Sequence, residues 1–401
     1  MRKIDYFAGV PLCLFFSVLC RLLSLFAAKP SAKPEKALFI ELSEMGSAIL
    51  VDPAMRKLRR ESGAALHFVI FAKNRASLNL LGTIPDENVF VIRDSGLALL
   101  VADTFRFLLW ARKKGIDTVI DLELFSRFTA LLTGLSGAKR RVGFHALHNE
   151  GLYRGDFLTH KVAYNPHIHI ARNFVALVNA LLSSGPEYSY VKTVIPDNEI
   201  ALEKVCVESG DLAAMRLRIK GACPGFDEQK HHIVLMNANA SELLPQRCWP
   251  PDNYGTLAKS ILERYPRIFL LFTGSRAERE NIEEIVASVG NTRCVNIAGL
   301  TAMADLAALY SISAFMLSND SGPAHFAAVT NMRTYVFFGP ETPGLYGSLG
   351  DSVPIFAGMA CSPCVSATNH RKTSCTDNRC LQVITPEQVL EIIAPDLMNL
   401  Q

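Results

Sequence analysis

The sequence predicts an α/β protein built from two Rossmann-like domains that face a central cleft, with a hydrophobic helix at the amino terminus. From residue 37 onward, short β-rich runs alternate with helical patterns of ten or more residues, which is typical of βαβ units and a parallel sheet. The alternation breaks at residues 186–196, where Pro and Gly gather, and restarts in a second half of similar size. An apolar stretch at residues 6–28 precedes both halves.

The composition excludes several classes of protein. Of the 401 residues, 49% are hydrophobic and 20% are charged, which excludes a disordered chain because such chains lack apolar residues to bury. Only one stretch is apolar enough to cross a bilayer, so a polytopic membrane protein is excluded too. The net charge is +3 with scattered Lys and Arg, which argues against a nucleic-acid partner because such a partner favours a concentrated basic stripe.

The apolar stretch at residues 6–28 admits three interpretations: a cleaved signal peptide, a single membrane span or signal anchor, and an interfacial helix that docks a soluble body on a membrane. The apolar run before Arg21 is short for a span, although Arg21 can snorkel near the interface. Three lysines follow the stretch, and this basic flank favours a main body on the cytoplasmic side. We therefore expect residues 1–36 to be a membrane-associating segment and linker.

The first domain is predicted over residues 37–190. Each of its β-rich runs precedes a loop or a stretch with helical periodicity. The predicted strands are 37–42, 66–71, 88–92, 118–122 and 141–144, and the predicted helices are 48–60, 73–81, 97–114, 125–135 and 167–184.

The second domain is predicted over residues 191–401 and repeats the pattern. Ligands of open parallel sheets bind beyond the carboxyl ends of the strands, so the loops that follow these strands are candidate sites. The predicted strands are 232–236, 268–272, 294–297, 314–317 and 333–338, and the predicted helices are 251–265, 277–289, 302–311, 322–330 and 386–397.

Three loops of the second domain carry candidate binding residues. In the first, Ser321 is a good N-cap for a helix whose first turn contains Pro, and such a helix start favours phosphate, although an ordinary capped turn fits as well. His325 in that helix also fits a core histidine. The loop around Gly339 contains two Pro and two Gly, and two such loops side by side suit a pyrophosphate. In the third loop, Glu278 either complements the helix dipole or binds ribose hydroxyls.

Four of the ten cysteines gather near the carboxyl terminus, with the spacing C-x2-C-x10-C-x4-C. Four thiolates at such spacing can form a tetrahedral structural zinc site, and disulfides or free thiols are the alternatives. The chain is neither short nor dense in cysteine, so we expect a reducing compartment. The candidate zinc ligands are Cys361, Cys364, Cys375 and Cys380.

Several motifs together make a resemblance to a known family specific. The segment Asn319-Asp-Ser-Gly-Pro-Ala-His325, followed by Val336-Phe-Phe-Gly-Pro-Glu-Thr-Pro343, resembles the signature of glycosyltransferase family 9, the heptosyltransferase family of lipopolysaccharide core synthesis. Arg247-Cys-Trp-Pro250 resembles the family's Lys-x-Trp-Pro segment, and residues 39–47 resemble its first loop. The resemblance covers roughly residues 37–395 and implies the GT-B architecture.

The resemblance also implies an activity. It implies inverting, metal-independent transfer of a sugar from a nucleotide-diphosphate donor, typically ADP-heptose, to a lipopolysaccharide-type or other lipid-linked acceptor at the cytoplasmic face of the inner membrane. No cofactor is then required for catalysis, and the cysteine cluster is expected to brace a loop. The implied roles are sugar and pyrophosphate binding for Asp320, Ser321, Gly322 and His325, ribose binding for Glu278, neutralisation of the leaving diphosphate for Arg247, and lining of the acceptor side for Ser43, Met45 and Gly46.

One position departs from the family pattern. The family's first loop reads Met-Gly-Asp, with the Asp as proposed general base, whereas this chain has Ser47, which cannot take a proton from the acceptor unaided. We predict Glu44 as the substitute base, with a solvated loop acid as the alternative and with Glu41 and Asp52 as weaker candidates. The loss of the Asp motivates a second hypothesis, a catalytically silent nucleotide-sugar-binding relative or scaffold. A zinc module that contacts nucleic acid is a third, which the near-neutral charge disfavours.

Overall fold

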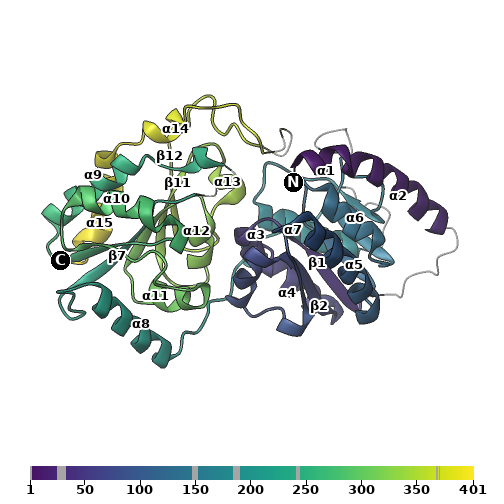
Figure 1. The fold of residues 1–401 in the computed structure, drawn as a ribbon, viewed down its shortest axis with the longest axis horizontal. Helices are drawn as coiled ribbons and strands as arrows, with labels where there is room; N and C mark the ends of the chain where they lie inside the picture. The colour runs from purple at the N-terminus through teal and green to yellow at the C-terminus, as the bar shows by residue number, and fades with distance from the viewer. Residues whose placement is uncertain are drawn as a thin grey trace. The chain divides into compact units, whose positions relative to one another are not determined.

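The chain folds into two compact α/β units, each with one six-stranded parallel sheet (Figure 1). This confirms the predicted fold class of two Rossmann-like domains in one chain. The first unit comprises Met1–Ala201 and Ala367–Arg371, and so runs past the predicted boundary at residue 190; the second comprises Leu202–Ser366 and Lys372–Gln401. The computed structural model describes residues 2–24, 33–146, 152–183, 190–240, 244–366, 369 and 371–401.

The first sheet has the strand order β3-β2-β1-β4-β5-β6, with every neighbour parallel. This order places β1 beside β4, at the point where the order reverses and where open α/β sheets bind ligands. The short strand β6 was not predicted because three residues carry too little pattern. The strands are β1 Lys36–Ile40, β2 Ala65–Phe71, β3 Val89–Ile92, β4 Thr118–Asp121, β5 Arg140–Phe144 and β6 His160–Val162.

Helices pack on both faces of the first sheet. Phe107 and Leu132 enter one hydrophobic cluster with strand residues such as Leu38, so α5 and α6 lie on the same face. The predicted helix 73–81 is instead the 3-10 segment η1, where side chains such as Asn74 bond to backbone and compete with helical pairing. The elements are α1 Arg2–Phe7, α2 Gly9–Ser24, α3 Met45–Leu50, α4 Asp52–Ser62, η1 Ala72–Asn79, η2 Asp86–Asn88, α5 Leu97–Lys114, α6 Arg127–Leu135, α7 Ile170–Leu182 and η3 Asp197–Glu199.

The second sheet has the order β12-β11-β10-β7-β8-β9, again with parallel neighbours. The loops after β7, β10 and β11 therefore emerge side by side at one edge of the sheet. Strand β12 was not predicted because it has no alternating or continuous apolar pattern. The strands are β7 His232–Asn237, β8 Ile268–Phe272, β9 Cys294–Asn296, β10 Phe315–Asn319, β11 Arg333–Phe338 and β12 Ser352–Phe356.

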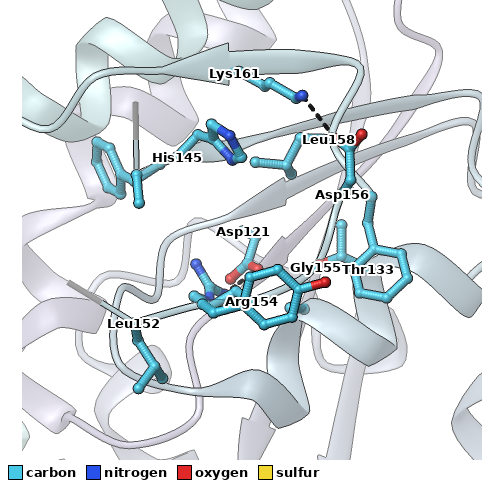
Figure 2. A pocket seen from close by; sticks show the side chains of 14 residues that line it. Asp121, Thr133, His145, Leu152, Arg154, Gly155, Asp156, Leu158 and Lys161 are labelled. Carbon is cyan, nitrogen blue, oxygen red and sulfur yellow. Dashed lines mark hydrogen bonds and ion pairs between the residues drawn. The ribbon is translucent and has the colours of Figure 1, made fainter. Parts of the chain in front are cut away.

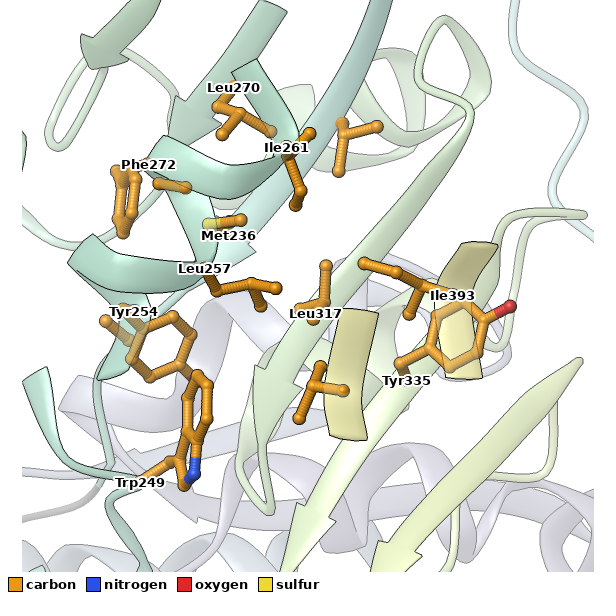
Figure 3. Close-up of a cluster of buried hydrophobic side chains, with 14 of the residues drawn as sticks. Met236, Trp249, Tyr254, Leu257, Ile261, Leu270, Phe272, Leu317, Tyr335 and Ile393 are labelled. Carbon is orange, nitrogen blue, oxygen red and sulfur yellow. The ribbon is translucent and has the colours of Figure 1, made fainter. Parts of the chain in front are cut away.

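The helices of the second unit pack on a large hydrophobic core around Trp249, Leu257 and Leu317 (Figure 3). Helix α8 was not predicted, since only Met215 and Ile219 of it are buried and its apolar residues show no periodicity. The elements are α8 Ser209–Ala222, η4 Pro245–Arg247, α9 Pro251–Arg264, η5 Arg276–Glu278, α10 Arg279–Val289, η6 Met303–Asp305, α11 Leu306–Ser311, α12 Gly322–Ala327, α13 Pro343–Tyr346, α14 Arg379–Gln382 and α15 Pro386–Met398.

The predicted amino-terminal hydrophobic helix forms as α2, which lies along α6 of the first unit (Figure 1). The stretch Asp5–Leu22 has the length and composition to cross a membrane and is 17% buried. Residues 29–32 of the predicted linker lie outside the described residues.

Candidate functional site

A buried cation and two buried carboxylates meet at the carboxyl edge of the second sheet. Nη1 of Arg247 lies 3.6 Å from Oδ2 of Asp320 and 3.9 Å from Oε2 of Glu341. The Arg247 side chain is 12% exposed, and the two carboxylates are 4% and 1% exposed. Asp320 follows β10 and Glu341 follows β11, so neighbouring strands deliver the acids to one cation. Both distances exceed hydrogen-bond length, and Nε of Arg247 has no hydrogen-bond partner among the described residues.

The position of Arg247 is set by Trp249, two residues later in the chain. The indole of Trp249 is fully buried and stacks on Phe337 of β11, with ring centroids 4.5 Å apart and an interplanar angle of 13°. Its backbone N–H donates to Oδ1 of Asn319 at 2.9 Å, and its Nε1 donates to the carbonyl of Ile384 at 2.8 Å. The Trp of the Arg-Cys-Trp-Pro motif is therefore a core anchor, and it holds the turn of residues 245–249, here called the Arg247 turn, against β10 and β11.

A second donor group lies at the end of β7. Asn319 donates from Nδ2 to the carbonyl of Asn239, which ties the loop after β7 to the end of β10. Nδ2 of Asn239 is itself buried and has no hydrogen-bond partner among the described residues. A Cβ added at Gly274 would lie 2.8 Å from that nitrogen, so the glycine allows the loop after β8 to approach it. Two kinds of N–H donor, amide and guanidinium, thus remain available at this edge for acceptor oxygens of a ligand.

The loop Asp320–Pro323 has the predicted strand-to-helix course, with a difference at Ser321. Ser321 occupies the N-cap position of α12, but its hydroxyl donates to the carbonyl of Asn319 at 3.2 Å and makes no capping hydrogen bond. A Cβ added at Gly322 would lie 3.1 Å from the Phe326 ring, so close packing explains this glycine. His325 is buried in α12. The predicted phosphate and sugar contacts of this loop stay predictions.

Two other predicted donor residues have structural roles. Oε2 of Glu278 accepts a hydrogen bond of 2.6 Å from the backbone N–H of Ser275, and the two residues form a capping box. Glu278 therefore caps the start of a helix in this structure, which was one of the two predicted roles. Ribose binding by Glu278 stays a prediction. A Cβ added at Gly339 would lie 2.8 Å from Leu381 and 3.0 Å from the Cys380 sulfur, so packing requires glycine there.

The cysteine segment braces the Arg247 turn. Nδ2 of Asn378 donates to the carbonyls of Gln246 and Cys248 at 3.2 and 2.9 Å, and Nε2 of Gln246 donates to the carbonyl of Cys375 at 3.0 Å. The residues on both sides of Arg247 are thus fixed by residues 375–378. This agrees with the expectation that the cluster braces a loop.

No disulfide joins any of the ten cysteines, all of which lie in the described part of the chain. Burial, and then the neighbouring thiols of Cys364, Cys361 and Cys375, raise the pKa of Cys380, so the four thiols lie in one region. The described residues nevertheless contain no group of three or more His, Cys, Asp or Glu side chains arranged to hold a metal ion. The structural zinc site stays a prediction.

In the first unit, the predicted acceptor loop follows β1 and begins α3. Ser43 is exposed, and Met45, Gly46 and Ser47 form the partly buried first turn of α3. Glu44 occupies the N-cap position without a capping hydrogen bond, and its carboxylate pairs with Arg371 of the same unit. The catalytic role of Glu44 stays a prediction.

The weaker candidate bases are buried beneath this loop. Asp52 is fully buried in α4 and pairs with Arg56 at 2.5 Å, which is a structural role. Glu41 lies beside Glu123, a residue not singled out from the sequence, and burial together with the charges of Glu123 and Glu44 raises the pKa of Glu41 well above its ordinary value. Oε1 of Glu123 accepts 3.2 Å hydrogen bonds from the backbone N–H groups of Leu42 and Ser43. Glu123 therefore supports the acceptor loop from below.

A cavity of about 520 Å³ opens in the first unit beside these residues (Figure 2). Arg154 crosses its wall, donating to Oδ2 of Asp121 and to the carbonyl of Glu123. Burial raises the pKa of Asp121 while the Arg154 charge opposes the rise. Across the cavity, Lys161 pairs with Asp156 at 2.7 Å. No sequence motif marks this cavity, because its polar residues are dispersed over β4, α6 and the stretch after β5, which has no recognisable pattern.

Glu123 links the cavity to the acceptor loop. Its carbonyl accepts from Arg154 in the cavity wall, and its carboxylate accepts from the N–H groups of Leu42 and Ser43. The signal for Glu123 was present in the sequence: Asp121-Leu-Glu123 ends a strand that pairs with β1, so both acids belong at the same sheet edge as the loop. For Glu341, the corresponding signal was its place three residues beyond the end of β11.

Comparison with known proteins places these features in a family. The family model for glycosyltransferase family 9 (heptosyltransferase) matches residues 109–374, which is more than half of the chain. The chain is 27% identical over 124 residues to lipopolysaccharide heptosyltransferase 2 of Escherichia coli, and this match covers 30% of the chain and 35% of that protein. The chain thus matches only about a third of the length of this curated relative.

Solved structures share the whole fold. The structure of E. coli ADP-heptose lipopolysaccharide heptosyltransferase II matches with a TM-score of 0.69 at 20% identity, over 91% of this chain and 99% of that one. The E. coli heptosyltransferase WaaC with ADP matches with a TM-score of 0.61 at 16% identity, over 90% and 99%. These likenesses extend the GT-B fold over both units. The chain belongs to glycosyltransferase family 9, the heptosyltransferase family.

Proposed function

We propose that the protein transfers a heptose from an ADP-linked donor to a hydroxyl group of a lipopolysaccharide-type acceptor. The observation that carries the proposal is the buried Arg247 guanidinium between Asp320 and Glu341, at the ligand-binding edge of the second sheet. Membership of the heptosyltransferase family and the likeness to a heptosyltransferase solved with ADP support a nucleoside diphosphate as the leaving group.

In the proposed reaction, an acceptor hydroxyl attacks the anomeric carbon from the face opposite the diphosphate. The new carbon–oxygen bond forms as the bond to the diphosphate oxygen breaks, so the configuration inverts. Negative charge then develops on the diphosphate, and the N–H groups of Arg247 donate to its oxygens and stabilise that charge. Asp320 and Glu341 hold the guanidinium in place, and Asp320 is proposed to contact the sugar of the donor. Because a guanidinium supplies the positive charge, the transfer is proposed to need no metal ion.

The proton of the attacking hydroxyl needs an acceptor, and we assign this role to Glu44. Its carboxylate lies at the start of α3, three residues before Ser47. Arg371 pairs with this carboxylate and fixes its orientation. The proton passes from the acceptor hydroxyl to a carboxylate oxygen of Glu44 as the new bond forms.

The cavity of the first unit is proposed to hold the acceptor. Its volume of about 520 Å³ suits one or two sugar units, and its walls carry the ion pairs Lys161–Asp156 and Arg154–Asp121. Glu123 connects that wall to the acceptor loop. A hydroxyl-rich acceptor sugar is the chemistry that this polar lining of paired charges favours. We propose that the protein meets this acceptor at the cytoplasmic face of the inner membrane.

The test is transfer from ADP-heptose to lipopolysaccharide that lacks its core heptose. Wild-type protein and Arg264→Ala, which alters an exposed cation at the end of α9, should transfer heptose at equal rates. Arg247→Ala should lose transfer. Ser47 favours a second candidate, a silent relative that binds the donor without transfer. Donor binding by wild type without any transfer would establish that candidate and overturn the enzyme proposal.

A further inference from the structure

Helix α2 has its polarity inverted for a helix on the surface of a soluble protein. The residues of α2 that are buried against the body are small or polar, namely Gly9, Cys13 and Ser17, and Phe16 packs beside them while partly buried. Most of the large apolar residues point outward instead. In an ordinary amphipathic helix the large apolar side chains would form the buried face. The exposed ones of α2, with exposed fractions from 36% to 63%, are Leu12, Leu14, Phe15, Val18, Leu19 and Leu22, and Phe7 at the end of α1 is 75% exposed.

Helix α5 repeats this feature on its outer side. Phe107 and Ala111 face the core, whereas Val101, Phe105 and Leu109 are 47%, 65% and 68% exposed at intervals of four residues. This spacing places the three exposed side chains on one stripe of the helix. The first unit therefore exposes two apolar helix surfaces rather than scattered single residues.

Both apolar surfaces adjoin α6, because both helices contact its carboxyl-terminal end. Sγ of Cys20 on α2 lies 3.7 Å from the carbonyl of Gly134, and Nη2 of Arg112 on α5 donates to the neighbouring carbonyl of Leu135 at 2.9 Å. The carboxyl-terminal ends of α2 and α5 thus meet the same end of α6 from two sides. We call the exposed apolar residues of α1, α2 and α5 together the apolar face.

The charges around the apolar face are mainly positive. Arg106, Arg112 and Lys113 are exposed on α5, and Arg21 is exposed near the end of α2. The described side chains of α1, α2 and α5 include two acids, Asp5 and Asp103, and each is paired with an arginine. An apolar surface with a basic rim complements a bilayer with anionic headgroups, where apolar side chains enter the interface and cations meet phosphate.

We propose that the apolar face docks this protein on an anionic phospholipid bilayer, with α2 and α5 lying in the plane of the interface rather than crossing the membrane. Three contacts, one from α1 and two from α2, hold this amino-terminal segment to the body. Asp5 pairs with Arg127 at 3.1 Å, the Ser17 hydroxyl accepts from the N–H of Asp156 at 2.7 Å, and the third is the Cys20 contact. A membrane-spanning α2 would lose all three.

The docked helix adjoins the cavity. A Cβ added at Gly155 would lie 2.6 Å from Oγ of Ser17, and Gly155 and Asp156 both line the cavity. The bilayer-facing helix is therefore one residue layer from the proposed acceptor pocket, which would let a lipid-anchored sugar reach it without leaving the membrane. This last step rests on the proposed function, whereas the docking itself does not.

The test is flotation of the full chain with lipid vesicles, with no sugar donor or acceptor present. Wild type should float with vesicles that contain phosphatidylglycerol and bind vesicles of phosphatidylcholine alone more weakly. The pairs Phe15→Glu/Val18→Glu and Phe105→Glu/Leu109→Glu should each lower binding about tenfold or more. The matched control is Val194→Glu/Leu217→Glu, which alters two exposed apolar residues away from the apolar face and should bind as wild type does.

Folding is checked by thermal unfolding and ADP binding, which both pairs should leave unchanged. Docking is overturned if either pair binds vesicles as wild type does. It is also overturned if wild type does not bind vesicles and instead forms dimers, and if both double variants are monomers. The apolar face would then contact a second copy of the chain. If alkaline carbonate fails to release wild type from bacterial membranes, α2 spans and the in-plane arrangement is wrong. Wild type that floats with vesicles but transfers no sugar would overturn the proposed function and leave the docking proposal intact.

Discussion

The guanidinium of Arg247 lies 3.6 Å from the carboxylate of Asp320, and both groups are buried. The two residues are far apart in the sequence and meet because Trp249 stacks on Phe337 beside the strand that Asp320 follows. A buried ion pair of this kind contributes little net stability, since desolvation offsets the attraction. It does fix the direction of the guanidinium, which is the property that a diphosphate site needs.

Removal of one partner should be costly for the fold. Asp320→Ala leaves Arg247 with Glu341 as its counter-charge among the described residues, and loss of one member of a buried pair costs about 3–5 kcal/mol. Chemical denaturation should show this loss. The isosteric change Asp320→Asn should cost less, because it keeps the side-chain volume and a polar oxygen facing the guanidinium. Equal stability of Asp320→Ala and wild type would show that Arg247 does not depend on this acid.

The hydrogen bonds from Asn378 to the Arg247 turn should influence ADP binding, although Asn378 is not itself a proposed ligand contact. Asn378→Ala removes two hydrogen bonds to the Arg247 turn and should cost about 1–3 kcal/mol of stability. It should also weaken ADP binding, because residues 246 and 248 are released. Asn399→Ala, at an exposed position after α15, is the control. ADP affinity is measured by calorimetry. An unchanged affinity in Asn378→Ala would show that the Asn378 hydrogen bonds do not influence ADP binding.

The buried Glu41 predicts a pH dependence of stability. Its pKa is raised in the folded state, so the fold binds this proton more tightly and loses stability as pH rises above the ordinary glutamic acid pKa. Glu41→Gln keeps a donor toward Glu123 and removes this loss. Its melting temperature should therefore exceed that of wild type at neutral pH, and the difference should vanish below about pH 4. A difference that is constant with pH would contradict the assignment.

The proposed base can be tested by rescue. Glu44→Gln should lower turnover about 10²–10⁴-fold and leave ADP affinity unchanged, because the amide cannot take a proton. The double variant Glu44→Gln/Ser47→Asp returns a carboxylate to the position where the family pattern has Asp, and should recover part of the turnover. Unchanged turnover in Glu44→Gln would remove Glu44 as the base.

The zinc prediction has a direct chemical test. Metal analysis of purified protein, with and without prior alkylation of thiols, should find zinc only in the unalkylated sample. Chelation should then weaken ADP binding, since residues 375–378 hold the Arg247 turn. If protein without bound metal binds ADP at full affinity, zinc is not needed to hold the Arg247 turn, and the hydrogen bonds from residues 375–378 are sufficient.

Much of the fold was predictable because both sheets consist of buried parallel strands, whose apolar runs stand out from the helices between them. The short or polar elements were not: β6 has three residues, β12 lacks an apolar pattern, and α8 buries only Met215 and Ile219. The 3-10 segment η1 was predicted as a helix because periodicity does not register side-chain bonds such as that from Asn74 to Leu42.

The candidate site was predictable where a motif carried it. The structure brings Arg247 and Asp320 together as the motifs indicated, whereas Glu278 and Gly339 have local structural roles. Glu123 and Arg154 were missed because their importance depends on cross-strand neighbours. The inverted polarity of α2 was equally hidden, since an apolar sequence does not tell which side faces the protein.

The central claim is that the Arg247 guanidinium binds the diphosphate of the donor. The most direct measurement is calorimetric titration of ADP and AMP into wild type, Arg247→Ala and the control Arg264→Ala. We predict that wild type and the control prefer ADP over AMP, and that this preference collapses about 10-fold or more in Arg247→Ala. An equal ADP-to-AMP preference in Arg247→Ala and wild type would contradict the claim.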